Sequence, residues 1–189
     1  MKGKRDQIID TTCQLMEVQG YHATGLNQIL AESGAPKGSL YHYFPEGKEE
    51  LAAESVARSA RVIEERMRTV MAEIDDAATA VITFILRLAE QVEASGYRAG
   101  GPITAVALES ASTNARLREA CDAAYQSWQS VFAEKLQQGG YGEARARRVA
   151  ALVIAALEGG IILSRSQRSP QPLLDVAAEL ELLLHCPPQ

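Results

Sequence analysis

The chain has 189 residues, 47% of them hydrophobic, and a formal net charge of −5. The apolar fraction is sufficient for a packed core and excludes a disordered chain. The acidic balance excludes a uniformly basic nucleic-acid binder, although local charge still decides such binding. Three separated cysteines without a CxxC pair predict neither a disulfide framework nor a zinc site, and they indicate a reducing compartment.

The N-terminus and the longest apolar stretch predict a soluble, cytoplasmic protein. The first ten residues, MKGKRDQIID, are partly basic but lack the apolar run of a secretory signal. The longest apolar stretch, Ala150 to Leu163, is shorter than a membrane span and contains Glu158. We therefore expect no membrane partner.

The first part of the chain predicts three short helices. Apolar residues recur at helical spacing between Gly and Pro breaks, and no segment alternates with period two. The first helix is expected over about residues 4–19, closed by Gly20. The second ends before Gly34, and the third spans residues 36–44 with a proline in its first turn.

Six longer helices are expected after Gly47. Asp75-Asp76 and Asn114 are suitable N-terminal caps for two of them. The expected ranges are about 48–73, 77–94, 103–112, 114–138, 143–165 and a last helix opened by Ser169-Pro170. The sequence thus predicts an all-α fold of about nine helices, with one domain over residues 1–47 and a second over residues 48–189.

Two short helices joined by a tight glycine turn are typical of a helix-turn-helix unit, whose second helix lies in the major groove of DNA. In the helix over residues 36–44, Leu40 and Phe44 are four apart and form one apolar docking face. Lys37 offers a cation near the helix start, and Gly38 lets the backbone approach DNA closely. Tyr41 can stack on a thymine methyl or reach a phosphate. Spacing alone leaves open a surface helix with scattered polar residues.

The segment from Gly20 to Leu51, GYHATGLNQILAESGAPKGSLYHYFPEGKEEL, resembles the TetR/AcrR family of bacterial transcription regulators. The match includes Gly-Tyr at the end of the first helix, Thr24, the Gly34 turn, Lys37-Gly38-Ser39-Leu40-Tyr41, Phe44 and Lys48-Glu49-Glu50-Leu51. The string PKGSLYHYFPEGKEEL, with GGPI at residues 100–103, is similar to the LmrA/YxaF-like branch.

The resemblance implies a three-helix DNA-binding domain and a larger helical domain that binds a ligand and dimerises. It implies a regulator, most often a repressor, whose dimer holds two recognition helices at the spacing of a palindromic operator. An inducer would tilt the fourth helix and release the DNA. The implied DNA contacts are Thr24 to a phosphate, Lys37, Gly38, Ser39 and Tyr41 to base edges and nearby phosphates, and His42, Tyr43 and Lys48 to the backbone.

Three positions depart from the family pattern. Gly25 stands where the family usually has Ser or Thr as a cap, and Leu30 stands where a small Ala is common. The linker Pro45-Glu46-Gly47 is one residue longer than the commonest form. The assignment of Lys48 is therefore less direct than that of Tyr41.

The last two helices are apolar around much of their circumference, which would be a liability on a monomer surface. The resemblance implies that they pair with their copies in a homodimer. Gly159-Gly160 inside a helix costs about 1 kcal/mol per glycine relative to Ala. Close packing of another helix would offset that cost, and the alternative is a locally weak helix.

The middle helices contain the candidates for a lipophilic or aromatic inducer site. These are Phe84, Leu88, Ile103, Val106, Tyr125, Trp128 and Phe132. The alternative for most of them is an ordinary core position, and Tyr125 and Trp128 are favoured as ligand contacts because of their polar tips. Glu109 and Glu158 are either polar partners of the ligand or ordinary carboxylates that are paired or solvated.

Two other functional classes are an enzyme and a helical adaptor that binds no DNA. An enzyme is disfavoured because no GxSxG, Walker, HExxH or GxGxxG motif occurs. The pair His185-Cys186 supplies too few ligands for a metal, so we expect no metal and no cofactor. A helical adaptor that binds no DNA would keep the bundle but would have no use for Lys37, Tyr41 and Lys48 on an outward face.

Overall fold

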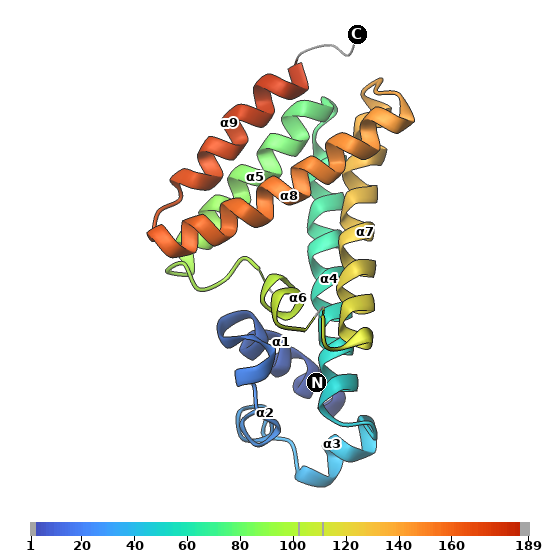
Figure 1. Ribbon diagram of the computed structural model, residues 1–189, viewed down its shortest axis with the longest axis vertical. Coiled ribbons are helices and arrows are strands. Elements are labelled where there is room, and N and C mark those ends of the chain that lie inside the picture. The colour runs from blue at the N-terminus through green and yellow to red at the C-terminus, as the bar shows by residue number, and fades with distance from the viewer. Residues whose placement is uncertain (1–2, 102, 111, 186–189) are drawn as a thin grey trace. The chain divides into compact units, whose positions relative to one another are not determined.

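The computed structural model describes residues 3–101, 103–110 and 112–185, and within them it contains nine α-helices and no strand (Figure 1). The expected all-α fold class is therefore confirmed. Contacts divide the chain into two compact units, residues 1–62 with 101–124 and residues 63–100 with 125–189. The helices α4 (Lys48–Glu73) and α7 (Ala115–Gln138) each contribute to both units.

The first unit contains the three short helices expected near the N-terminus. They are α1 (Lys4–Ala23), α2 (Leu26–Ser33) and α3 (Lys37–Tyr43), joined in this unit by α6 (Thr104–Ser110). The helix α1 packs against α2, α3 and α6 (Figure 1). The predicted stop at Gly20 appears as a break, because φ there is 81° and one further turn follows to Ala23.

The docking face expected on α3 lies in the core of this unit. Leu40 and Phe44 are fully buried, and they pack with Ile8, Ile29 and Leu51 from α1, α2 and α4. Burial of large apolar side chains stabilises such a domain by about 1.5–3 kcal/mol each. The apolar residues of α3 thus hold the helix in place and leave its other faces to solvent.

The second unit is built on α5 (Ala77–Ala94), α8 (Glu143–Gln167) and α9 (Gln171–His185), which pack against one another in pairs (Figure 1). The predicted cap of α5 is confirmed, because the Asp76 carboxylate accepts a hydrogen bond from the Thr79 amide at 2.8 Å. In the first unit, Asn114 likewise accepts from the Leu117 amide at 3.0 Å and caps α7. Residue 186 of the His-Cys pair lies outside the described residues.

The helix α8 extends beyond the apolar stretch noted in the sequence. It has 25 residues and a mean hydropathy of 1.7 over its most apolar window, which is long and apolar enough to cross a membrane. Within that window 44% of the residues are buried inside the chain. The core helix of a soluble protein has the same length and composition, so these features carry little weight for a membrane span.

The two adjacent glycines of α8 have different surroundings. A Cβ at Gly160 would lie 2.8 Å from Leu173 Cδ2 and 3.5 Å from Val176 Cγ2 of α9. A Cβ at Gly159 would meet nothing within 4 Å. Close packing therefore explains Gly160 within the chain, whereas Gly159 faces open space.

Candidate nucleic-acid interface

The outward face of α3 carries most of the residues expected to contact DNA. Tyr41 is 51% exposed, and Lys37, Gly38 and His42 are also exposed. Their exposure follows from the burial of Leu40 on the opposite face, since residues four apart share one side of a helix. The helix thus presents a cation, a glycine and a phenol to solvent.

Lys37 and Gly38 at the start of α3 are not used by the fold. Within the described residues Lys37 has no acidic partner, so its ammonium group can contact an anion outside the chain. A Cβ at Gly38 would meet nothing within 4 Å, so packing inside the chain does not require a glycine there. The sharp turn before α3 is made by Gly34, whose φ of 63° ends α2 in the left-handed conformation that favours glycine.

Ser39 and Tyr43 are half-buried. The Tyr43 ring packs against the core of the first unit and meets the Phe44 ring edge-on, with 6.5 Å between centroids. The His42 ring stands edge-on to Tyr43 at 5.0 Å. Tyr43 therefore serves the packing of α3 as well as its surface.

Thr24 lies in a different environment from the one expected of a phosphate contact. Its side chain is 1% exposed, and its hydroxyl donates a hydrogen bond to the Gly20 carbonyl at 2.6 Å. Its backbone amide donates to the Tyr21 carbonyl at 3.2 Å. Because the only proton of the hydroxyl is already donated, the structure favours a role for Thr24 in closing α1.

Lys48, at the start of α4, is half-buried and held by the end of α1. Its ammonium lies 4.4 Å from the centroid of the Tyr21 ring and donates to the His22 carbonyl at 3.4 Å. Burial lowers the pKa of Lys48, and the charge of Glu109 partly offsets this effect. Lys48 thus links the start of α4 to the end of α1.

Glu109 of α6 is one of the two carboxylates that the sequence predicts to be either a polar partner of the ligand or an ordinary carboxylate. In the structure it is paired, because its carboxylate accepts a hydrogen bond from the His22 amide at 2.8 Å. The two residues are 87 positions apart in the chain. No sequence pattern signals this contact.

The residues expected to line a ligand site are divided between the two units. In the second unit, Phe84 and Phe132 stand edge-on at 5.8 Å, and Tyr125 and Trp128 stand edge-on at 5.5 Å. Trp128 is 4% exposed. The half-buried Leu88 belongs to this unit, whereas Ile103 and Val106 are fully buried in the first.

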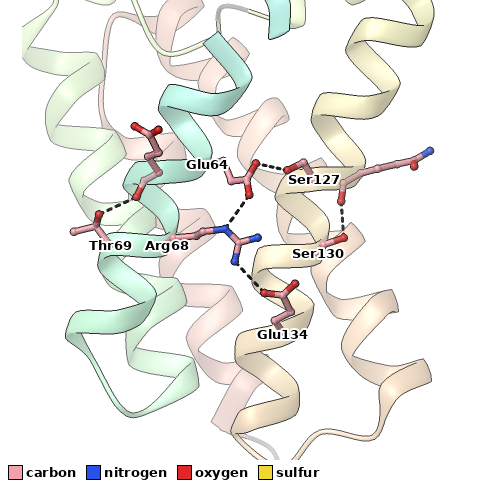
Figure 2. A network of polar contacts seen from close by, with 8 residues as sticks. Glu64, Arg68, Thr69, Ser127, Ser130 and Glu134 are labelled. Atoms are coloured by element: carbon pink, nitrogen blue, oxygen red, sulfur yellow. Dashed lines mark hydrogen bonds and ion pairs between the residues drawn. The ribbon is translucent and has the colours of Figure 1, made fainter. Parts of the chain in front are cut away.

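A polar network joins α4 to α7 within the second unit (Figure 2). The Glu64 carboxylate accepts hydrogen bonds from the Ser127 hydroxyl at 2.5 Å and from the Arg68 guanidinium at 2.8 Å. Arg68 also donates to Glu134 at 3.0 Å. The Ser127 hydroxyl, followed by Arg68, lowers the pKa of Glu64. Arg68 is about half exposed, so these pairs fix geometry more than they add stability.

Several large apolar side chains of α8 and α9 are exposed. They are Leu152 (49%), Ile162 (43%), Leu163 (51%) and Leu182 (66%). On α8, Gly159 follows Leu152 by seven residues, and Ile162 and Leu163 follow Gly159 by three and four. These spacings place the four residues on one side of the helix, which we call the α8 face. Exposed large apolar side chains that share one face of a helix are typical of an interaction surface.

Comparison with known proteins agrees with this geometry. Residues 8–55 match the model of bacterial regulatory proteins of the tetR family, and residues 77–179 match the C-terminal domain of LmrA/YxaF-like transcriptional regulators. The chain is 42% identical over 180 residues to the uncharacterized HTH-type transcriptional regulator YxaF of Bacillus subtilis (strain 168), covering 95% of this chain and 94% of that protein. It is 41% identical to the HTH-type transcriptional regulator LmrA of the same organism, covering 95% and 96%.

The fold is also similar to that of solved structures. A TetR transcriptional regulator from Chloroflexus aurantiacus J-10-FL superposes with a TM-score of 0.82 at 29% identity, covering 97% of this chain and 94% of that one. Regulators of this family bind DNA and generally act as dimers with small-molecule ligands. The helix-turn-helix geometry and these matches together show that the chain belongs to the tetR family of transcriptional regulators, in its LmrA/YxaF-like branch.

Proposed function

We propose that this regulator is a ligand-responsive repressor, which binds a palindromic operator as a homodimer and is released by a small lipophilic or aromatic inducer. The observation that carries the DNA-binding part is the outward face of α3. There Lys37, Gly38 and the half-exposed Tyr41 stand opposite the buried docking residues. A cation, a close backbone and a phenol are suited to phosphates and base edges in the major groove.

The proposed DNA contacts keep the expected set with one change of role. Base edges and nearby phosphates are contacted by Lys37, Gly38, Ser39 and Tyr41. The sugar-phosphate backbone of the DNA is contacted by His42, Tyr43 and Lys48. The buried Thr24 acts by holding the end of α1 from which α2 begins. The proposed domains are residues 1–47 for DNA binding and residues 48–189 for ligand binding and dimerisation.

The homodimer is proposed to form through α8 and α9. The exposed leucines and isoleucine of the α8 face and Leu182 of α9 support this assignment, as does the open space at Gly159. A two-fold dimer places two copies of α3 on one duplex about one helical turn apart, which is the geometry of a palindromic site.

The inducer site is proposed to lie in the second unit and to use Phe84, Leu88, Tyr125, Trp128 and Phe132, whereas the expected Ile103 and Val106 are fully buried in the first unit. Within the second unit, the ring pairs Phe84–Phe132 and Tyr125–Trp128 support an aromatic or lipophilic ligand. Apolar and aromatic residues with a few polar tips are typical of small-molecule sites. The proposal also includes action in the cytoplasm, without a cofactor and without a catalysed reaction.

The test of DNA binding is a titration of a labelled duplex from the region upstream of the gene, followed by fluorescence anisotropy. We expect the wild type to bind and Tyr41→Ala and Lys37→Ala each to bind about 5- to 100-fold more weakly, because a specific base contact contributes about 1–3 kcal/mol. Arg98→Ala, an exposed cation outside α3, is the matched control and should bind as the wild type does. Normal binding by Tyr41→Ala would refute the recognition-helix assignment.

Trp128 provides a test of the ligand site because it is the only tryptophan in the chain. A panel of planar aromatic and lipophilic compounds is screened for release of the duplex. We expect compounds that release DNA also to quench or shift the Trp128 emission. A releasing compound that leaves the emission unchanged would remove Trp128 from the site.

A further inference from the structure

The carboxylate of Glu109 occupies a recess at the end of α1 that only a glycine leaves open. A Cβ built on Gly20 would overlap the Glu109 carboxylate group. Gly20 also has a φ of 81° and a ψ of 177°, a conformation that is essentially restricted to glycine. This backbone shape turns the His22 amide toward Glu109, which accepts its hydrogen bond at 2.8 Å.

The residues around Glu109 also connect the segment that precedes α2 with the segment that follows α3. The chain enters this pair after His22 and leaves it before Lys48. The Lys48 ammonium donates to the His22 carbonyl at 3.4 Å and lies over the Tyr21 ring. Glu109 accepts from the amide of His22 and attracts the charge of Lys48. We call these four residues and Gly20 the Glu109 joint.

The chemistry of the joint favours a positioning role over a ligand contact. A hydrogen bond from an amide to a carboxylate is charge-assisted and is stronger than a neutral one. Without Glu109, the His22 amide would lose this charge-assisted hydrogen bond, and the half-buried Lys48 would lose a nearby negative charge. Glu109 is therefore engaged with α1, and its carboxylate is not free to serve as the polar partner of an inducer.

We propose that Glu109 is a positioning residue for DNA binding: through His22 and Lys48 it fixes both ends of the α2–α3 pair and so the placement of α3. This inference rests on the proposed function, because it assumes that α3 reads DNA. Glu109 itself touches no DNA in this proposal. Its effect passes through the backbone of His22 and the charge of Lys48.

The test compares Glu109→Ala, which removes the acceptor, with Glu109→Gln, which keeps an acceptor of similar size. The probe is a duplex that the wild type selects from a random library. We expect Glu109→Ala to bind about tenfold more weakly and Glu109→Gln to stay within about threefold of the wild type. Glu119→Ala, an exposed carboxylate on α7 in the same unit, is the control for loss of one negative charge.

A double-mutant cycle separates positioning from a general loss of stability. Glu109→Ala and Lys48→Ala should be strongly non-additive in DNA affinity, because both changes act through the contact to His22. Glu109→Ala should also be non-additive with Lys37→Ala, because Lys37 lies on the helix α3 that Glu109 is proposed to position. Amide hydrogen exchange provides a readout that needs no DNA. The His22 amide should lose at least about tenfold protection in Glu109→Ala and keep it in Glu109→Gln.

The outcomes distinguish the two proposals. If the wild type selects no duplex, the proposed function is refuted, and the role of Glu109 in DNA binding falls with it. If the wild type binds and Glu109→Ala binds equally well or more tightly, only the positioning role is refuted. Unchanged exchange of the His22 amide in Glu109→Ala would overturn the Glu109 joint itself.

Discussion

The adjacent glycines of α8 allow a sharp test of the proposed dimer interface. At Gly159 a Cβ would meet no atom of the same chain within 4 Å, so Gly159→Ala should stabilise the isolated fold by about 1 kcal/mol through helix propensity. If the α8 face packs against a second copy, the two added methyl groups overfill that contact. Overpacking of a close-packed contact costs about 1–3 kcal/mol.

We therefore expect the dimer dissociation constant of Gly159→Ala to rise about 5- to 100-fold, as measured by sedimentation equilibrium, since each 1.4 kcal/mol is a factor of ten. Gly160→Ala is the matched control. Its Cβ would lie 2.8 Å from Cδ2 of the fully buried Leu173, so the same overpacking cost should fall on the fold and leave the dimer unchanged. A Gly159→Ala protein that is more stable and dimerises normally would refute the assignment of the α8 face.

Three further results are expected. Thr24→Val should lower the free energy of unfolding by about 1 kcal/mol, because the Gly20 carbonyl loses its donor, with DNA affinity within about twofold of the wild type; the reverse pattern in denaturation and anisotropy would support a phosphate contact instead. Asp76→Ala should cost about 1 kcal/mol at pH 7 in urea denaturation. Hydrogen bonds from the Thr79 hydroxyl and amide lower the pKa of Asp76 in the folded protein. The stabilisation that the Asp76 carboxylate provides is therefore complete above its pKa in the unfolded chain, near 4, and is lost as the pH falls through its pKa in the folded protein. An equal cost of Asp76→Ala at pH 7 and pH 2 would contradict this origin. Burial raises the pKa of the Cys121 thiol from an ordinary value of 9.0 to about 11, so alkylation at pH 8, followed by mass spectrometry, should be about 100-fold slower than for an exposed thiol until the chain unfolds; rapid labelling of the folded protein would show that Cys121 is accessible.

Local patterns were sufficient to predict most helices and the face of α3. The i, i+4 spacing of Leu40 and Phe44 identifies a docking face, and the structure buries both residues completely. The cap at Asp76 involves residues only three apart, so it is also visible in the sequence. The helix expected over residues 103–112 is shorter than predicted, because α6 begins at Thr104 and ends at Ser110 within the described residues.

The sequence by itself determined the helical architecture and the outward set Lys37, Gly38 and Tyr41, because helix periodicity, caps and turns depend on neighbouring residues. Only the tertiary structure decided which polar side chains form hydrogen bonds within the protein. It buried the Thr24 hydroxyl against a carbonyl of α1, and it brought Glu109 to an amide 87 positions away. Such contacts depend on how helices pack, and packing brings together residues whose distance along the chain carries no periodic signal.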